Sequence, residues 1–263
     1  MIREWNCMRL AGAFLRAANA LVSFVVALCL CTAGLYSVYA LWDNNRVYSA
    51  AEDVRADMMK LKPVVIEDNG ASFEELLAVN PDVCAWVTID NTNIDYPVLQ
   101  GATNLTYINT DVYGNFAMAG SIFLDSRSDR GFGDTYSLLY GHHMANGNMF
   151  GDLDKFEEET FFRKNKTGTL ILPDRTYDLE IYACMLVTAS ENAIFDPQQY
   201  QDDINSLLDF VEQNALYYDA DTVAGLRQTD GSSQILALST CSSEFTDART
   251  IILTVMKPRN SAD

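Results

Sequence analysis

The chain begins with a long apolar segment, and charged residues bound it on both sides. From Ala17 to Trp42 no residue is charged, and about 20 apolar residues are enough to cross a bilayer as a helix. Arg3, Arg9 and Arg16 precede the segment and Asp43 follows it. Because positive charge accumulates on the cytoplasmic side of membrane proteins, this pattern predicts an anchor with a cytoplasmic N-terminus and an extracellular remainder.

Two other interpretations of this segment are less consistent with the pattern. A cleaved signal peptide has a passable cleavage site at Val38-Tyr39-Ala40. Its apolar region would, however, exceed the roughly 7–15 residues that such peptides carry. A buried core helix disagrees with the length and with the flanking charges, so the pattern favours an uncleaved anchor.

After the anchor the chain becomes charged and prone to form helix as far as Pro63, which predicts a partly helical stalk. Ser72 followed by Glu75 has the spacing of a capping box, which predicts a short helix through Ala78. The predicted organisation is a cytoplasmic tail over residues 1–16, a transmembrane anchor over 17–42, a stalk over 43–70 and a folded domain over 71–260.

Beyond residue 80 the pattern changes to short runs of β-forming residues separated by turns. Many short strands without regular alternation with helices predict a mainly β fold, a closed antiparallel-type barrel rather than a parallel α/β sheet. The predicted strands are Cys84–Ile89, Ile94–Leu99, Ser121–Leu124, Tyr136–Tyr140, Thr169–Leu172, Tyr177–Thr188, Gln234–Leu238 and Thr250–Met256.

One segment departs from this β pattern and predicts a helix over Tyr200–Tyr218. Asp202 and Asp203 stand at its start, where acidic side chains suit the helix dipole. Its apolar residues have helical spacing and are Ile204, Leu207, Leu208 and Val211.

Composition narrows the class of protein. The chain has 263 residues, a hydrophobic fraction of 49% and a net charge of −18. Such acidity argues against nucleic acid as a partner and is typical of a solvated surface, with at most a slight preference for cationic substrates such as amines. The six cysteines show no zinc-ligand spacing. We therefore predict no metal and no cofactor, while a bridge between Cys84 and Cys184 remains open.

Three residue types that together perform acyl transfer stand near predicted strand ends. Cys241 follows an apolar strand, Arg249 begins the last strand, and both histidines of the chain, His142 and His143, occupy one loop after Gly141, whose freedom suits a tight bend. A thiolate near a cation is a nucleophile, imidazole transfers protons, and arginine stabilises an oxyanion. Taken singly, a cysteine is more often structural and a histidine merely exposed.

Other cysteine enzymes agree less well with this order of residues. Papain-like enzymes place the cysteine before the histidine, whereas here the cysteine comes last. The Ser-x-Gly-Cys setting of L,D-transpeptidases and the glycine-rich stretch of chymotrypsin-like cysteine proteases are both missing around Ser239–Ser243.

Five stretches between Phe73 and Lys257 carry a family pattern, and they are Asn80–Trp86, Ile94–Val98, Gly120–Asp125, Tyr140–Phe150 and Leu238–Arg249. In these stretches the chain resembles a class B sortase, a cysteine transpeptidase of the Gram-positive cell surface. The resemblance implies an eight-stranded barrel with a helix inserted between the sixth and seventh strands, where the helix predicted before the Cys241 strand lies.

The resemblance also assigns roles to individual positions. The Gly-His motif makes His142 the catalytic histidine, Cys241 becomes the nucleophile and Arg249 the conserved arginine. The calcium site of some class A members has no counterpart here. The implied substrate-groove residues are Asn104, Ile108, Ser239 and Thr240.

The implied reaction is cleavage of a C-terminal sorting signal after threonine through a thioester, followed by transfer to an amine. The signal is of the type Asn-Pro-x-Thr-x or Leu-Pro-x-Thr-Gly, and the amine belongs to a peptidoglycan precursor or to a pilin lysine. The lid motif of class C pilin polymerases is absent from residues 60–72, which favours wall anchoring. The alternatives are a pilin-polymerising sortase and a non-catalytic sortase-like binding module.

Overall fold

The computed structural model describes residues 2–66, 70–201, 203–229, 233–241 and 248–259, and for Cys241 it describes the backbone. Contacts between residues divide the chain into two units, Met1–Val47 and Tyr48–Asp263.

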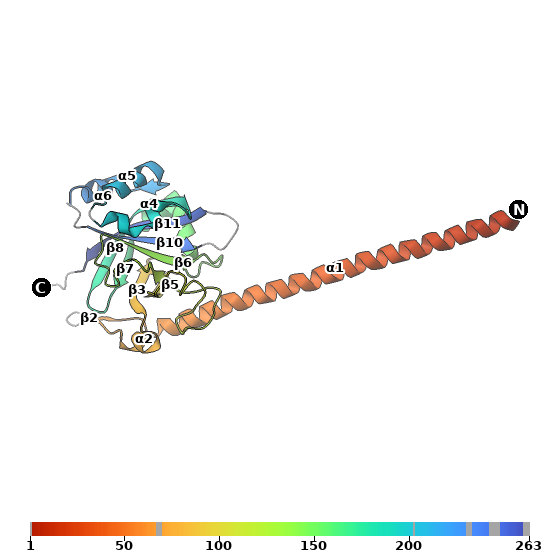
Figure 1. Cartoon of the computed structure of the whole chain (residues 1–263), viewed down its shortest axis with the longest axis horizontal. Coiled ribbons are helices and arrows are strands. Elements are labelled where there is room, and N and C mark those ends of the chain that lie inside the picture. The colour runs from red at the N-terminus through yellow and green to blue at the C-terminus, as the bar shows by residue number, and fades with distance from the viewer. Residues whose placement is uncertain (1, 67–69, 202, 230–232, 242–247, 260–263) are drawn as a thin grey trace. The chain divides into compact units, whose positions relative to one another are not determined.

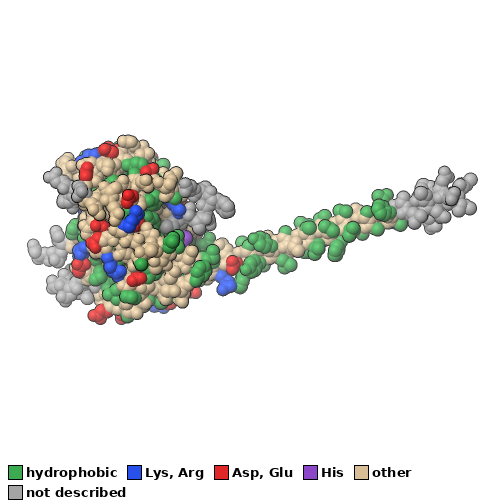
Figure 2. Space-filling model, in the orientation of Figure 1, with side chains coloured by type: hydrophobic (Ala, Val, Ile, Leu, Met, Phe, Trp, Pro, Cys, Tyr) green, Lys and Arg blue, Asp and Glu red, His purple; other side chains and the backbone are tan. Residues whose placement is uncertain are grey.

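A single helix, α1 (Ile2–Met59), contains the predicted anchor. Within it, Gly12–Met59 includes a window of 18 residues with a mean hydropathy of 2.2, none of it buried. Figure 2 shows hydrophobic side chains along this helix. Among the described residues, α1 is thus a candidate membrane span.

The last turns of α1 belong to the second unit. Val54 and Met58 pack into a core cluster that includes Leu76 and Trp86, and the Asn148 amide donates to the Glu52 carboxylate at 2.9 Å. The packed unit therefore begins inside the segment that the sequence predicts as a stalk, and the predicted boundaries themselves stay predictions.

The entry into the second unit corrects one expectation. Strands β1 (Val65–Ile66) and β2 (Gly70–Ala71) form an antiparallel pair, and α2 (Glu74–Val79) follows. The capping box predicted at Ser72 is wrong, because Phe73 occupies the N-cap position without a side-chain hydrogen bond. Phe73 is buried beside Leu76, so packing rather than capping fixes the start of this helix.

Eight strands close into a barrel. In the sheet, the order β11-β10-β6-β5-β4-β3-β7-β8 is closed by the pairing of β11 with β8, and β9 adds to β8. The strands that the sequence predicts are all present, with ends that differ by up to three residues. They are β3 (Val83–Ile89), β4 (Asp95–Leu99), β5 (Ile122–Leu124), β6 (Tyr136–His142), β7 (Thr167–Ile171), β8 (Thr176–Thr188), β10 (Gln234–Cys241) and β11 (Ala248–Pro258). The remaining strand, β9 (Tyr217–Tyr218), lies at the end of the segment that the sequence predicts as a helix.

The barrel is not purely antiparallel, which is a second correction. Strands β4 and β5 are parallel, and so are β6 and β10. Parallel neighbours cannot be joined by a hairpin and need a crossover. Residues 100–121 form the first crossover, and the chain between His142 and Gln234 forms the second.

The second crossover holds the helical insertion that the sequence predicts, in several short pieces rather than one helix over 200–218. Figure 1 shows α4, α5 and α6 gathered on one side of the barrel. Their apolar side chains and those of β6, β8, β10 and β11 form one core cluster. The helices of this crossover are η1 (Gly151–Glu157), α3 (Glu159–Lys164), α4 (Asn192–Phe195), η2 (Pro197–Tyr200), α5 (Asn205–Asn214) and α6 (Ala220–Leu226).

Two sequence expectations about particular side chains are settled by the barrel. Cys84 and Cys184 are both buried and free, so the open question of a bridge between them is answered. Asp203 lies just before Ile204, the N-cap residue of α5, and accepts from the Asn205 backbone N–H at 2.9 Å. Asp202 lies outside the described residues.

Gly141 is required by close packing and not by a bend. It lies inside β6, and a Cβ there would stand 2.4 Å from Ile122 Cδ1 and 2.7 Å from Phe150 Cγ. The absence of a side chain lets these two residues pack under the end of β6.

We expect Gly141→Ala to destabilise the protein by about 1–3 kcal/mol, because the methyl group overpacks the barrel interior. The matched control is Gly225→Ala in α6, where nothing lies within 4 Å of the added carbon. That control should leave stability unchanged or raise it by up to about 1 kcal/mol. Urea unfolding followed by fluorescence measures both, and equal midpoints would contradict the packing argument.

Candidate active site

The ends of three strands meet at one edge of the barrel. Strands β6 and β10 are parallel, and their register pairs His142 with Cys241, the last residue of each strand. Strand β11 runs antiparallel to β10 with Ser239 opposite Ile251. Continued by two residues, this register brings Arg249 level with Cys241, so the three predicted catalytic positions converge.

Strand alternation places these positions on one face of the barrel. On β6, Tyr136 and Leu138 pack under the helical insertion. Side chains two residues apart point the same way in a strand, so Tyr140 and His142 continue this face. The residues of β10 and β11 in the same cluster, such as Ala237 and Ile251, are an even number of residues from positions 241 and 249 on their strands. His142 therefore lies, partly buried, on the continuation of the face that the insertion covers.

The His142 ring is held by the first crossover. Its Nε2 lies 2.6 Å from the Ile108 carbonyl oxygen. A carbonyl oxygen only accepts hydrogen bonds, so Nε2 carries the hydrogen and donates it. The Nδ1 atom is left to take up and release a proton.

Burial is the main reason that the pKa of His142 lies below its ordinary value of 6.5. The Ile108 carbonyl partly opposes this effect by stabilising the protonated ring, whereas the positive charge of Arg249 lowers the pKa further. Arg249 is thus near enough to His142 to act on it electrostatically.

The second histidine has a different environment. His143 Nε2 lies 2.6 Å from Asp154 Oδ2, on the 3-10 helix η1. The Thr250 hydroxyl donates to Glu157 Oε1 at 2.8 Å on the same helix. Of the two adjacent histidines, His142 is the one whose ring contacts the predicted groove segment.

The predicted groove residues divide into two kinds. Ser239 and Thr240 are both buried, and Thr240 Oγ1 accepts from the Thr250 backbone N–H at 3.1 Å, which ties β10 to β11. Ile108 meets the site through its backbone carbonyl. The assignment of these three residues and of Asn104 to the substrate groove stays a prediction.

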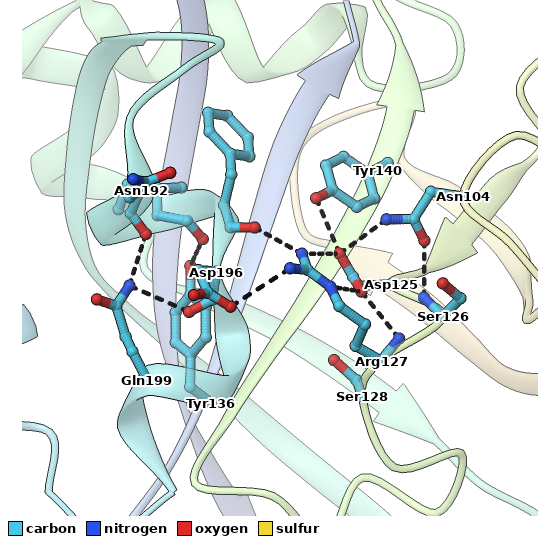
Figure 3. Close-up of polar contacts among 12 residues, drawn as sticks. Asn104, Asp125, Ser126, Arg127, Ser128, Tyr136, Tyr140, Asn192, Asp196 and Gln199 are labelled. Carbon is cyan, nitrogen blue, oxygen red and sulfur yellow. Dashed lines mark hydrogen bonds and ion pairs between the residues drawn. The ribbon is translucent and has the colours of Figure 1, made fainter.

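Asn104 belongs to a hydrogen-bonded cluster that sequence analysis did not identify. Its Nδ2 donates to Asp125 Oδ2 at 2.9 Å, and the Tyr140 hydroxyl donates to the same oxygen at 3.0 Å. Figure 3 shows Asp125 between Asn104, Tyr140 and Arg127. The signal in the sequence is a carboxylate and an arginine two positions apart at the end of a strand, together with a tyrosine directly before Gly141.

Within the described residues, no three His, Cys, Asp or Glu side chains are grouped so as to hold a metal ion.

Comparisons with known proteins point in one direction. A family model described as a sortase domain matches residues 87–257. Sortase B of Listeria monocytogenes is 31% identical over 207 residues, covering 78% of this chain and 81% of that protein. A solved class B sortase of Streptococcus pyogenes involved in pilus biogenesis is 37% identical, with a TM-score of 0.63 and coverage of 71% and 98%. A Staphylococcus aureus sortase B–substrate complex is 25% identical, with a TM-score of 0.64 and coverage of 81% and 95%.

We expect NMR titration to give His142 a pKa below 6.5, and Arg249→Met to raise it because a nearby positive charge is removed. Burial is the larger cause, so the pKa in the variant should remain below 6.5. The chain has two histidines, and His143→Gln assigns the resonances. An unchanged pKa in Arg249→Met would contradict the proximity of the two groups.

Proposed function

Because this chain belongs to the class B sortases, which are cysteine transpeptidases, we propose that Cys241, His142 and Arg249 are its catalytic residues. The observation that carries this proposal is the register of β6 and β10, which aligns His142 with Cys241 at the same edge of the barrel. Arg249 starts the neighbouring strand β11 near that edge.

The first step is attack of the Cys241 thiolate on the threonine carbonyl carbon of a bound sorting signal. The carbonyl oxygen becomes negative, and the Arg249 guanidinium stabilises it by charge and hydrogen bonding. Arginine stays protonated in proteins, so it acts as a donor and never as a base.

His142 transfers protons in both half-reactions. As imidazolium it protonates the departing amine through Nδ1, which leaves a thioester on Cys241. The neutral ring then accepts a proton from the incoming amine, which attacks the thioester and releases the product. Thiolate and imidazolium must be present together for the first of these steps, and the burial that lowers the pKa of His142 disfavours its imidazolium form.

The proposed substrate is a surface protein with a C-terminal signal of the Asn-Pro-x-Thr-x or Leu-Pro-x-Thr-Gly type. The likeness to the sortase B–substrate complex supports a peptide-binding groove on this barrel. Its proposed lining is Asn104, Ile108, Ser239 and Thr240.

The proposed location is the cell membrane, with α1 as an uncleaved anchor, the N-terminus cytoplasmic and the catalytic domain outside. The apolar window in α1 and the arginines before it support this orientation. The domain boundaries proposed are those of the sequence, with an anchor over 17–42 and a catalytic domain over 71–260.

We expect the full chain in detergent micelles to cleave a sorting peptide and to join it to an added amine. Cys241→Ala should abolish both activities because the nucleophile is lost. Arg249→Lys should lower kcat/KM by about 100-fold, since one ammonium cannot replace the guanidinium fork at an oxyanion. Chromatography of the peptide products measures cleavage and transfer, and activity retained in Cys241→Ala would sink the proposal.

The buried cysteines provide a control that also tests for a non-catalytic binding module. Burial raises the pKa of Cys84 and that of Cys184 to about 12, so neither thiol is reactive. A thiol-reactive analogue of the sorting peptide should therefore modify Cys241 in preference to both. Equal modification of the three sites, or none, would favour a binding module.

The proposed biological task is attachment of a few surface proteins to peptidoglycan. The absence of a class C lid motif before the barrel supports it. The second candidate is pilin polymerisation, favoured by the likeness to the Streptococcus pyogenes enzyme, which is involved in pilus biogenesis. Both tasks use the same acyl-enzyme and differ in the amine that resolves it.

We expect deletion of the gene to release surface proteins as monomers into the medium and to leave pili intact, because the acyl acceptor is a wall precursor. Immunoblots of the wall and medium fractions measure this, with the Cys241→Ala allele as the matched control. Loss of high-mass pilin ladders would instead assign the enzyme to pilus assembly.

A further inference from the structure

Asp125 is a fully buried carboxylate whose oxygens are both occupied by donors. It follows β5, and its side chain has 0% exposure. Oδ1 accepts from the backbone N–H and Nε of Arg127, both at 2.9 Å. Oδ2 accepts from Arg127 Nη2 at 2.8 Å, from Asn104 and from Tyr140. Figure 3 shows these contacts converging on the carboxylate.

The carboxylate is ionised at neutral pH. Burial alone raises the pKa of Asp125, but the hydrogen bonds from Arg127 and Asn104 outweigh it, so the pKa lies below its ordinary value of 3.8. A buried charge is tolerated only when it is paired and hydrogen-bonded. The geometry of the donors around Asp125 is therefore strongly constrained.

These donors come from three separate segments. Asn104 belongs to the first crossover, and Tyr140 belongs to β6, two residues before His142. Arg127 extends to the insertion, where its Nη2 donates to the Phe195 carbonyl at 2.6 Å and its Nη1 lies 3.3 Å from Asp196 Oδ1. One ion pair thus fixes the first crossover, the histidine strand and α4 relative to one another.

Asn104 is held in a single orientation by two different partners. Its Nδ2 donates to Asp125, while its Oδ1 accepts from the Ser126 backbone N–H at 2.7 Å. An amide nitrogen has two hydrogens, so one N–H of Asn104 remains available. Because the Asp125 carboxylate only accepts hydrogen bonds, it fixes the orientation of the Asn104 amide. The group that Asn104 can offer to a ligand is therefore an N–H donor and not the amide oxygen.

The Tyr140 ring is fixed as well. It stacks on Phe123 with the centroids 5.2 Å apart, and on Phe195 at 6.3 Å with an angle of 11° between the planes. Its hydroxyl is directed to Asp125. The ring therefore joins the barrel to the insertion beside the strand end that carries His142.

We propose that Asp125 and Arg127 are positioning residues for the sorting signal, because they orient the Asn104 amide toward the peptide and hold the groove walls at a fixed separation. This inference rests on the proposed function. It assigns a role in peptide binding, upstream of the chemistry at Cys241, to residues that do not touch the reacting atoms.

The test compares Asp125→Asn with a matched ion pair at the opposite end of β11. There Arg259 Nε donates to Asp178 Oδ1 at 3.0 Å. The Asp178 side chain is half exposed, so Asp178→Asn removes an arginine-paired carboxylate away from the groove without disturbing a buried charge. In the full chain in micelles, Asp125→Asn should raise the KM for an Asn-Pro-x-Thr-x or Leu-Pro-x-Thr-Gly peptide about tenfold, as expected for loss of a charged hydrogen-bond acceptor. Asp178→Asn should leave KM unchanged.

Two further readouts separate positioning from a general loss of structure. Alkylation of Cys241 by iodoacetamide, followed by mass spectrometry, should proceed at the wild-type rate in Asp125→Asn. In an Asn104→Ala background, Asp125→Asn should raise KM by clearly less than it does in the wild-type chain, because the part of its effect that passes through Asn104 is already gone.

A KM for Asp125→Asn that equals that of Asp178→Asn would overturn the proposal, and so would a full KM increase in the Asn104→Ala background. Slowed alkylation together with reduced kcat would overturn it as well. If Asp125→Asn does not fold, Arg127→Lys replaces it, and its KM is compared in the wild-type and Asn104→Ala backgrounds in the same way. The expected increase in KM is then smaller. If the wild-type chain itself neither cleaves nor transfers the peptide, the proposed function fails, which is a separate result.

Discussion

The parallel pairing of β6 with β10 is the constraint on which the candidate site depends. Two parallel strands end at the same edge of a sheet, and here their last residues are His142 and Cys241. Parallel neighbours need a crossover between them, and this crossover contains β7, β8 and the helical insertion. The same segments close the barrel when β8 pairs with β11. The segments that close the barrel therefore also bring His142 level with Cys241.

The insertion is both a part of the core and a neighbour of the site. Its apolar side chains cover the face of β6 and β10 that, at the strand ends, leads to the proposed catalytic positions. Tyr136 packs edge-to-face on Tyr200 of η2, with the centroids 5.3 Å apart. Further along the same face Tyr140 meets Phe195. The packing that stabilises the barrel thus also fixes the position of the insertion residues that lie beside the end of β6.

Polar constraints complete the arrangement where apolar packing ends. The first crossover contributes the Ile108 carbonyl, which fixes the tautomer of His142. It also contributes Asn104, which the buried Asp125 holds. A carbonyl and a carboxylate have directional requirements that apolar contacts lack, so these two acceptors set the position of the crossover more tightly than its exposed side chains could.

The sequence by itself determined the apolar segment of α1, the eight barrel strands and the presence of a helical insertion before the Cys241 strand, because period, composition and motif spacing are local signals. It also supplied the residues that we propose as catalytic. It also predicted that Arg249 would return beside Cys241, since a short connection joins their strands. It did not determine the parallel pairs, the start of α2 at Phe73 or the role of Asp125, because each of these depends on contacts between residues far apart in the chain. Gly141 illustrates the difference: its motif marks the histidine, but only the packing of Ile122 and Phe150 in the folded barrel explains why no side chain fits there.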